Sequence, residues 1–187
     1  MTVWCRIRCA RPIRAVRHWL RLVLLACSLV CLSALAADRV AEAPIVLSDR
    51  HQPIDVWPAV SVLYDERGQW TLDEVRTRLP QRERPMVPAA NFGERRGAVW
   101  LVWDFELRSS ALGTWLLDVG NPQLDLVDLQ VLHEGRPLPE AAQRAGDARP
   151  LSWRALPTRT HVLPLDLAPG RYTLVLRVAS EGTVIAP

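Results

Sequence analysis

Hydrophobic and polar residues alternate along most of the chain after residue 53, and a period of two residues is typical of β-strands. The clearest alternating segment is 99–107, in which every second residue is hydrophobic: Val99, Leu101, Trp103, Phe105 and Leu107. We expect this set to face the core. The intervening residues, which include Trp100 and Asp104, are expected on a mixed and half-exposed face of the same strand.

The same alternation predicts further short strands, separated by segments rich in Gly, Pro, Asn and Asp that are typical of turns. These strands are expected at 115–119, 127–131, 161–167 and 172–178, with shorter ones at 44–47, 151–156 and 183–185. Another strand-like segment, 54–63, contains Pro58. Proline cannot donate a ladder hydrogen bond, so this segment is expected at a sheet edge or in a bulge.

One helix is expected, at 71–79. Thr71 and Glu74 have the spacing of a capping box, and the hydrophobic residues that follow share one face. Pro80 ends the helix. The segments 80–96 and 138–150 are expected as loops, the second with a helical turn as an alternative to a plain loop. The first holds three prolines, and a functional loop and a solvated excursion are equally consistent with it.

About eight short strands with one short helix predict an all-β fold, an antiparallel β-sandwich. The long connections after Leu63 and Leu132 favour crossovers between two sheets, as in a jelly roll. No alternation of strands and helices is present that would indicate a parallel sheet. We expect the sandwich to occupy residues 54–187 and a polar lead-in to occupy residues 37–53.

The first 36 residues are expected to form a signal peptide. Six arginines and no acidic residue precede an apolar run at 22–35, and Ala34-Leu35-Ala36 is a typical cleavage site. The apolar run is shorter than the ~20 residues that cross a bilayer. Two alternatives are an uncleaved N-terminal anchor, which would keep the protein attached to the membrane, and lipidation at Cys27.

Cleavage after Ala36 changes the formal charge from +3 to −3, because it removes six arginines and no acidic residue. The positive charge therefore belongs to the signal peptide, and we expect no nucleic-acid partner. All four cysteines lie in the same segment, so the remaining chain has no disulfide and no thiolate metal site.

The common catalytic motifs are absent: there is no G-x-S-x-G, no H-E-x-x-H and no P-loop. We therefore expect no enzyme activity, no cofactor and no metal. His161 has inward parity and is expected as a core histidine whose ring is hydrogen-bonded. Asp118, Asp125 and Asp128 gather near one turn, where a solvated cluster is favoured over a calcium site because no ligand spacing accompanies them.

Six tryptophans follow residue 36, and Trp103 and Trp115 have the parity of core residues. Trp100 has the opposite parity, so its ring either packs beneath another segment or offers a flat surface to a ring-shaped ligand. Packing is favoured because burial of a large aromatic ring is strongly stabilising. If a ligand site exists, we expect it at Trp100, Trp153 and Asp104, together with the loop at 80–96.

Several motifs resemble, in their order and spacing, the type 2 extracellular sensor domain of bacterial 7TM-DISM receptors. These are seven-transmembrane receptors with diverse intracellular signalling modules. The resemblance covers roughly residues 52–187. The motifs are Asn91-Phe92-Gly93, Ala98-Val99-Trp100-Leu101, Trp115-Leu116-Leu117-Asp118-Val119-Gly120-Asn121-Pro122, Leu124-Asp125, Val127-Asp128-Leu129, Gly146-Asp147, Arg149-Pro150, Leu156-Pro157, Val162-Leu163-Pro164-Leu165, Pro169-Gly170, Leu174 and Leu176-Arg177-Val178.

This resemblance implies a jelly-roll sandwich similar to carbohydrate-binding modules, located in the periplasm and sensing a small-molecule ligand, for which a carbohydrate is the usual assumption. The family passes its signal through seven membrane helices to a diguanylate cyclase or a histidine kinase. None of these modules is found in this sequence, and its last strand is expected to be incomplete, as in a truncated receptor. The alternatives are a stand-alone secreted carbohydrate-binding protein and a partner-binding sandwich without a ligand.

Overall fold

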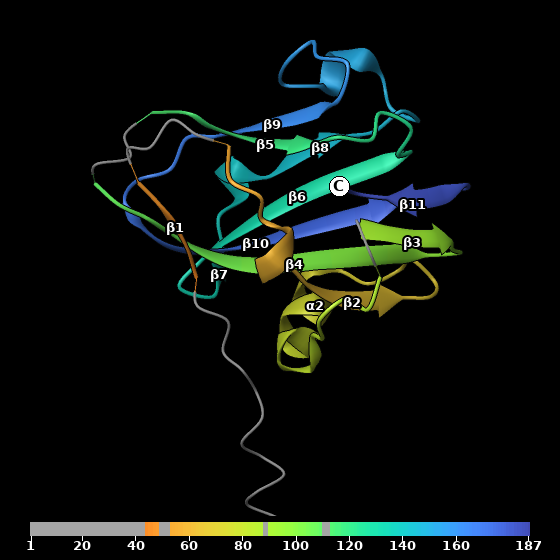
Figure 1. The fold of residues 1–187 in the computed structure, drawn as a ribbon, viewed down its shortest axis with the longest axis horizontal. Coiled ribbons are helices and arrows are strands. Elements are labelled where there is room, and N and C mark those ends of the chain that lie inside the picture. Colours follow the sequence, from red (N-terminus) through yellow and green to blue (C-terminus); the bar gives the residue numbers. More distant parts are fainter. Residues whose placement is uncertain (1–43, 49–52, 88–89, 110–112) are drawn as a thin grey trace, which may run out of the picture. The chain divides into compact units, whose positions relative to one another are not determined.

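Two long antiparallel strands, β4 (Ala98–Leu107) and β10 (Gly170–Ala179), form the centre of the largest sheet in the computed structural model (Figure 1). β6 (Leu126–His133) pairs with the other edge of β10, also antiparallel. All three strands fall where alternation predicts them, because each has an unbroken period of two.

The structure describes residues 44–48, 53–87, 90–109 and 113–187. The predicted signal peptide at 1–36, and the lead-in at 37–53 apart from residues 44–48 and 53, lie outside the described residues. Among the described helices, none is long and apolar enough to cross a membrane.

Short strands occupy both outer edges of the large sheet. β1 (Ile45–Leu47) and β2 (Ser61–Asp65) pair end to end with the outer edge of β4. β7 (Arg136–Pro137) and β8 (Gln143–Ala145) share the outer edge of β6 in the same way. β1 runs parallel to β4, and this is the one parallel pair among the described strands of an otherwise antiparallel fold.

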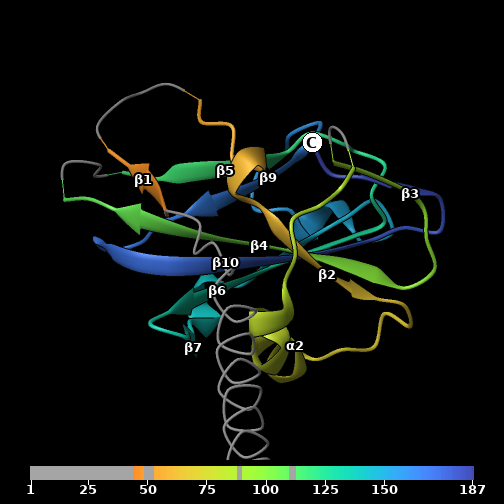
Figure 2. The same cartoon turned by 60° about the horizontal axis from the view of Figure 1, so that its bottom comes forward.

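The second layer of the sandwich consists of two separate two-stranded sheets. β5 (Trp115–Val119) pairs with β9 (His161–Leu165), and β3 (Asn91–Glu94) pairs with β11 (Thr183–Ile185). Figure 2 shows β5 and β9 on one side of the large sheet and the helix α2 on the other. The all-β sandwich is therefore confirmed, whereas the jelly-roll connectivity stays a prediction.

The main core lies between the two layers. The five hydrophobic residues of β4 with inward parity are all buried in it, at 0–4% exposure, as predicted. Phe92 and Val184 reach the same core from β3 and β11, and Leu163 reaches it from β9. In β5 the burial also alternates as expected, since Val119 is buried and Leu116 is exposed.

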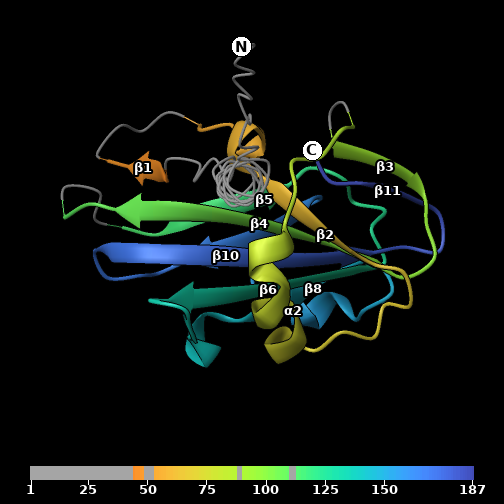
Figure 3. The same cartoon turned by 90° about the horizontal axis from the view of Figure 1, so that it is seen from below.

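A second, smaller core lies under the helix α2 (Leu72–Arg78), which crosses the opposite face of the large sheet (Figure 3). The helix begins with the predicted capping box: the Glu74 amide donates to the Thr71 hydroxyl, and the Thr71 amide donates to the Glu74 carboxylate. Val75 is completely buried against the sheet. The buried members of this core are Leu63, Val75, Trp100, Val102, Leu132 and Val175.

Three segments differ from the prediction. The segment 80–96 contains β3, preceded by a 3-10 turn η2 (Leu79–Gln81). The segment 138–150 contains the expected helical turn, as the 3-10 turn η4 (Pro139–Ala141), and in addition the strand β8. The predicted strand at 151–156 is instead a 3-10 turn, η5 (Leu151–Trp153), in which the Trp153 amide bonds to the Pro150 carbonyl. Pro58 lies in another such turn, η1 (Trp57–Ala59), before the edge strand β2. Short local hydrogen bonds replace ladder pairing where proline interrupts the chain.

His161 lies on β9, opposite Val119, and is completely buried. The predicted core position is confirmed. The predicted hydrogen-bonded ring stays a prediction, because neither ring nitrogen has a described partner of strict hydrogen-bond geometry, although the Pro122 backbone acts on the ring as a hydrogen-bond partner. Burial, followed by the nearby positive charge of Arg154, lowers the pKa of His161 below its ordinary value of 6.5. The Pro122 backbone and the carboxylates of Asp147 and Asp118 act in the opposite direction and are outweighed.

Trp100 and Trp153 should differ sharply in their contribution to stability, because Trp100 is 3% exposed and Trp153 is 51% exposed. We expect Trp100→Ala to lower the free energy of unfolding by about 3–5 kcal/mol, since it leaves a cavity under α2. Trp153→Ala should change it by no more than about 0.5 kcal/mol. Urea unfolding of both variants checks this, and equally small losses would show that the Trp100 ring is not packed.

Acidification should destabilise the fold through His161. Because burial disfavours the charged ring, the unfolded chain binds the proton more tightly, and the free energy of unfolding falls as the pH drops below the ordinary value of 6.5. Urea unfolding of the protein and of His161→Phe between about pH 7.5 and 5.5 measures the contribution of His161 to the pH dependence of the free energy of unfolding. The variant should lose less stability over this interval; parallel pH profiles would contradict the assignment.

Candidate functional site

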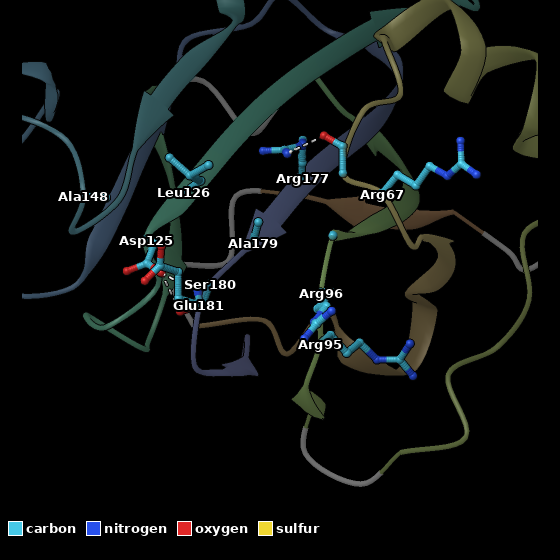
Figure 4. Close-up of a pocket in the computed structure, with 12 residues that line it drawn as sticks. Arg67, Arg95, Arg96, Asp125, Leu126, Ala148, Arg177, Ala179, Ser180 and Glu181 are labelled. Carbon is cyan, nitrogen blue, oxygen red and sulfur yellow. Dashed lines mark hydrogen bonds between the residues drawn. The ribbon is translucent and has the colours of Figure 1, made fainter.

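A pocket of about 710 Å³ lies at the end of the large sheet where β4 and β6 begin and β10 ends (Figure 4). Its walls come from five places in the sequence: the loop between β2 and α2, the residues just before β4, the residues at the start of β6, Ala148 after β8, and the end of β10. Its charged lining residues are Arg67, Arg95, Arg96, Asp125, Arg177 and Glu181.

Two Arg-Gly pairs bring two of these arginines onto neighbouring loops. Gly68 and Gly97, which follow Arg67 and Arg96, have φ angles of +65° and +91°. A Cβ atom at Gly97 would lie 2.1 Å from the Asp65 carbonyl oxygen, and one at Gly68 would lie 3.2 Å from the Gly97 Cα. Only glycine permits both the left-handed backbone and this close approach. The two backbones therefore touch, and the arginine before each glycine lines the same pocket.

Hydrogen bonds fix the loop between β2 and α2 in this position. The Asp65 carboxylate accepts from the Trp70 amide at 2.8 Å, and the Asp65 carbonyl accepts from the Gly68 amide at 3.1 Å. Arg177 Nη2 on β10 donates to the Gly68 carbonyl at 3.1 Å, a contact drawn in Figure 4. The wall that carries Arg67 is thus tied to the central strand of the sheet.

Arg177 belongs to a largely buried charge network beneath the pocket. Its Nη1 lies 3.3 Å from Asp128 Oδ2, and Arg149 Nη1 lies 2.6 Å from Asp128 Oδ1. The three side chains are only 14–16% exposed. Two guanidinium groups share one carboxylate, which leaves a surplus of positive charge on this side of the sheet. Arg177 is therefore a structural cation that also makes the pocket electropositive.

Arg95 is held by a stacking contact. Its guanidinium carbon lies 4.3 Å from the centroid of the Tyr64 ring, and its Nε donates to the Phe92 carbonyl at 3.1 Å. A guanidinium that stacks on an aromatic ring uses its flat face, so the N–H groups along its edge remain available. Arg95 is fixed in place without losing its capacity to bind an anion.

Arg67 and Arg96 are exposed and make no hydrogen bond or ion pair with any residue in the part of the chain that the structure describes. They occur in a chain that has a formal charge of −3 once the first 36 residues are set aside. Acidic residues therefore outnumber basic ones overall, yet none of those described pairs with these two arginines. The pocket concentrates positive charge that the fold itself does not use.

The opposite wall is acidic. Figure 4 shows Asp125, Ser180 and Glu181 together on one side of the pocket and Arg95 and Arg96 on the other. Asp125 Oδ2 accepts hydrogen bonds from the Ser180 hydroxyl at 3.0 Å and from the Glu181 amide at 2.6 Å. Glu181 is exposed. The pocket thus has a cationic side and an anionic side, and a ligand with both kinds of group matches it.

The acidic residues near the turn at Asn121 do not form a metal centre in the described ranges, where no group of three suitable ligands is found. Asp125 is bound by Ser180 and the Glu181 amide, and Asp128 is paired with two arginines. Asp118 is exposed on β5. The solvated cluster that we expected is thus wrong for Asp128, whose charge is compensated inside the fold.

The three residues predicted from the sequence as a ligand site do not come together at this pocket. Trp100 is buried under α2, which is the packing alternative for this ring. Asp104 lies on the same face of β4 and accepts hydrogen bonds from Arg82 at 3.0 Å and Thr173 at 2.5 Å. Trp153 is exposed on η5, with the Arg149 guanidinium carbon 5.9 Å from its ring centroid. A ligand-binding role for these residues stays a prediction.

The pocket arginines were not predicted, although the sequence contains a signal for them. Arg67-Gly68 and Arg96-Gly97 each place a long cation before a residue that permits a left-handed turn. The first pair lies in the turn after β2 and the second just before β4, so both lie at strand ends. What the sequence does not contain is the contact between these ends, which depends on the pairing of β2 with β4.

A second cavity, of about 370 Å³, lies between β1, β5 and the inner face of the large sheet. Most of its lining is apolar and includes Trp103, Phe105 and Leu174 from the main core, and Trp115 from β5. Asp55 and Asp118 are its charged lining residues. This cavity suits an uncharged or apolar ligand and contrasts with the arginine-lined pocket.

A comparison with known families gives one finding. The family described as 7TMR-DISM extracellular 2 matches residues 58–187, a segment that contains every residue lining the arginine pocket. No curated protein matches the chain.

The close contact at Gly97 can be tested against Gly93, a second glycine near β4. Gly93 also has a left-handed backbone (φ +70°), but a Cβ atom added there would have no other atom within 4 Å. Gly93→Ala should lower the free energy of unfolding by roughly 1–2 kcal/mol, from its backbone conformation alone. Gly97→Ala should lower it by a further 1–3 kcal/mol or so, because the methyl group meets the Asp65 backbone. Equal losses in urea unfolding would contradict the backbone contact that forms the pocket.

Proposed function

We propose, because the chain belongs to the 7TMR-DISM extracellular 2 family, that it is the ligand-sensing domain of a membrane receptor and that it works in the periplasm. The family membership makes it an extracellular domain of a receptor class. The predicted signal peptide supports export across the inner membrane. The ligand site is the arginine-lined pocket.

The observation that carries this proposal is the surplus charge of the pocket. Arg67 and Arg96 form no hydrogen bond or ion pair with a described residue, yet the Gly68–Gly97 contact holds their loops together. Among the described residues, no ion pair results from gathering these cations in one place, whereas a binding site for an anion would use them. A pocket of about 710 Å³ also falls in the range of small-molecule sites. No catalytic step is assigned to these residues.

The proposed receptor output lies in other modules. The family passes its signal through seven membrane helices to a cyclase or a histidine kinase, and we assign those activities to such modules and not to this sandwich. The pocket joins the β2–α2 loop to the ends of β4 and β10. A ligand that bridges these walls stabilises their present arrangement over others, which is the differential binding that a sensor requires.

The apolar cavity favours a second candidate, a stand-alone secreted carbohydrate-binding protein. Its lining combines the rings of Trp103 and Phe105 with the carboxylates of Asp55 and Asp118. Sugar rings pack their apolar faces on aromatic side chains and donate hydrogen bonds to carboxylates. A neutral sugar bound there would not depend on the pocket arginines.

Export is tested by fusing alkaline phosphatase, whose activity needs disulfides formed outside the cytoplasm, to the C-terminus of the full chain. We expect an active fusion in a bacterial host, and loss of activity when residues 22–35, the apolar run, are deleted. An inactive fusion of the intact chain, produced at the same level, would place the protein in the cytoplasm and contradict the proposal.

Ligand sensing is tested by a thermal-shift screen of the purified protein against sugars, organic acids, amino acids and phosphorylated metabolites. A ligand at a concentration of about 100 Kd stabilises the folded state by about 2.7 kcal/mol, which corresponds to a rise in melting temperature of roughly 5–10 °C. Bovine serum albumin serves as the control for nonspecific stabilisers. A flat screen across all four classes would favour a partner-binding sandwich without a ligand.

A further inference from the structure

We propose that the arginine-lined pocket binds a small organic acid: a carboxylate or phosphate held by the arginines, with hydroxyl or ammonium groups at the other end facing Asp125 and Glu181. This inference rests on the proposed function and assigns the chemical class of its ligand. It rests on which charged residues of the pocket have hydrogen-bond or ion-pair partners among the described residues and which have none.

The cationic side is incomplete without an anion. Arg67 and Arg96 lie on two loops whose backbones touch, and no described carboxylate neutralises either of them. The buried network below contributes a further surplus cation, since Arg149 and Arg177 share the single carboxylate of Asp128. An anion bound in the pocket would be attracted by this uncompensated positive charge.

The donor geometry selects a planar or tetrahedral oxyanion. Guanidinium groups present parallel N–H donors that match the oxygens of a carboxylate or phosphate. Arg95 is pre-oriented by its stacking on Tyr64, so little side-chain freedom is lost when it binds. Arg177 donates to Asp128 and to the Gly68 carbonyl, so we expect it to contribute a positive electrostatic potential to the pocket and not a direct hydrogen bond to the ligand.

The acidic side limits the charge of the ligand. Glu181 is exposed and makes no ion pair in the described structure, and Asp125 has one oxygen occupied by Ser180 and the Glu181 amide. Carboxylates accept hydrogen bonds and repel other anions. A ligand with negative charge along its whole length is therefore disfavoured, whereas hydroxyl or ammonium donors at its far end are recognised.

The size and surroundings of the pocket select a small molecule. A volume of about 710 Å³ holds a monosaccharide acid, a sugar phosphate or an amino acid. A polyanion would also be repelled by the net charge of −3 that the chain carries after residue 36. The structure thus favours a compact acid with polar groups over an anionic polymer or a membrane surface.

The test compares matched ligands by isothermal titration calorimetry on the purified protein. Galacturonate and galactose differ in one carboxylate, and galactose 6-phosphate replaces it with a phosphate; glutamate supplies an ammonium group, and inorganic phosphate is the probe for a bare anion. We expect at least one organic acid to bind at least tenfold more tightly than galactose and inorganic phosphate. Its affinity should fall as the salt concentration rises.

Charge-neutralising variants locate the site. Arg96→Gln should weaken binding of that acid about 10- to 100-fold, as expected for the loss of one hydrogen bond between charged groups. Arg67→Gln should weaken it in the same direction. Arg136→Gln is the matched control, because Arg136 is also exposed but lies on β7, opposite His133 at the far end of β6, and should leave the affinity unchanged.

Each alternative outcome has a definite meaning. The apo melting temperature of Arg96→Gln should not fall, because Arg96 forms no hydrogen bond or ion pair with a described residue, and this separates lost binding from lost structure. Galactose bound as tightly as galacturonate, with no effect of Arg96→Gln, would overturn the inference but leave ligand sensing intact. Inorganic phosphate bound as tightly as any organic acid would reduce the site to a simple anion site. A panel in which no acid binds would also overturn the inference, and failure of the broader thermal-shift screen as well would remove the proposed function.

Discussion

The central constraint on this fold is that β4 is buried on both faces along its first six residues. One face supports the main sandwich core and the other supports the smaller core under α2. A strand buried on both sides has no room for charge in its middle, because an unpaired buried charge is strongly unfavourable. Charged side chains are therefore confined to its ends, and the pocket that we propose as the ligand site lies at one of them.

The two ends of the large sheet differ in how their charges are matched. At one end Asp104 pairs with Arg82 at 3.0 Å, and Glu106 lies 3.3 Å from Arg171. At the other end Arg67 and Arg96 have no partner among the described residues. Exposed ion pairs contribute little to the free energy of unfolding, so the stability of the fold does not explain why one end has paired charges and the other has unpaired arginines. Among the described residues, the arginine-lined pocket lies at the end with the unmatched cations.

Features of the chain that depend on local pattern could be predicted, and features that depend on tertiary contact could not. The inward set of β4 and the capping box at Thr71 follow from periodicity and spacing, and both are confirmed. The same periodicity places Trp100 on the outward face of β4 but does not show what covers that face. The helix α2 covers it only in the folded chain. The strands β3 and β8 are short, and their partners, β11 and β6, lie far away in the sequence. The pocket is of the same kind, since it joins the two Arg-Gly pairs to the end of β10.

The most direct test of the account is hydrogen–deuterium exchange of the protein with and without the tightest-binding organic acid. If the arginine pocket is the sensor site, protection should increase in the β2–α2 loop, the residues before β4 and the end of β10, which are the three walls that carry its arginines and Glu181. Exchange in η5, which contributes nothing to the pocket, should not change. Protection confined to β1 and β5 around the apolar cavity would contradict the account.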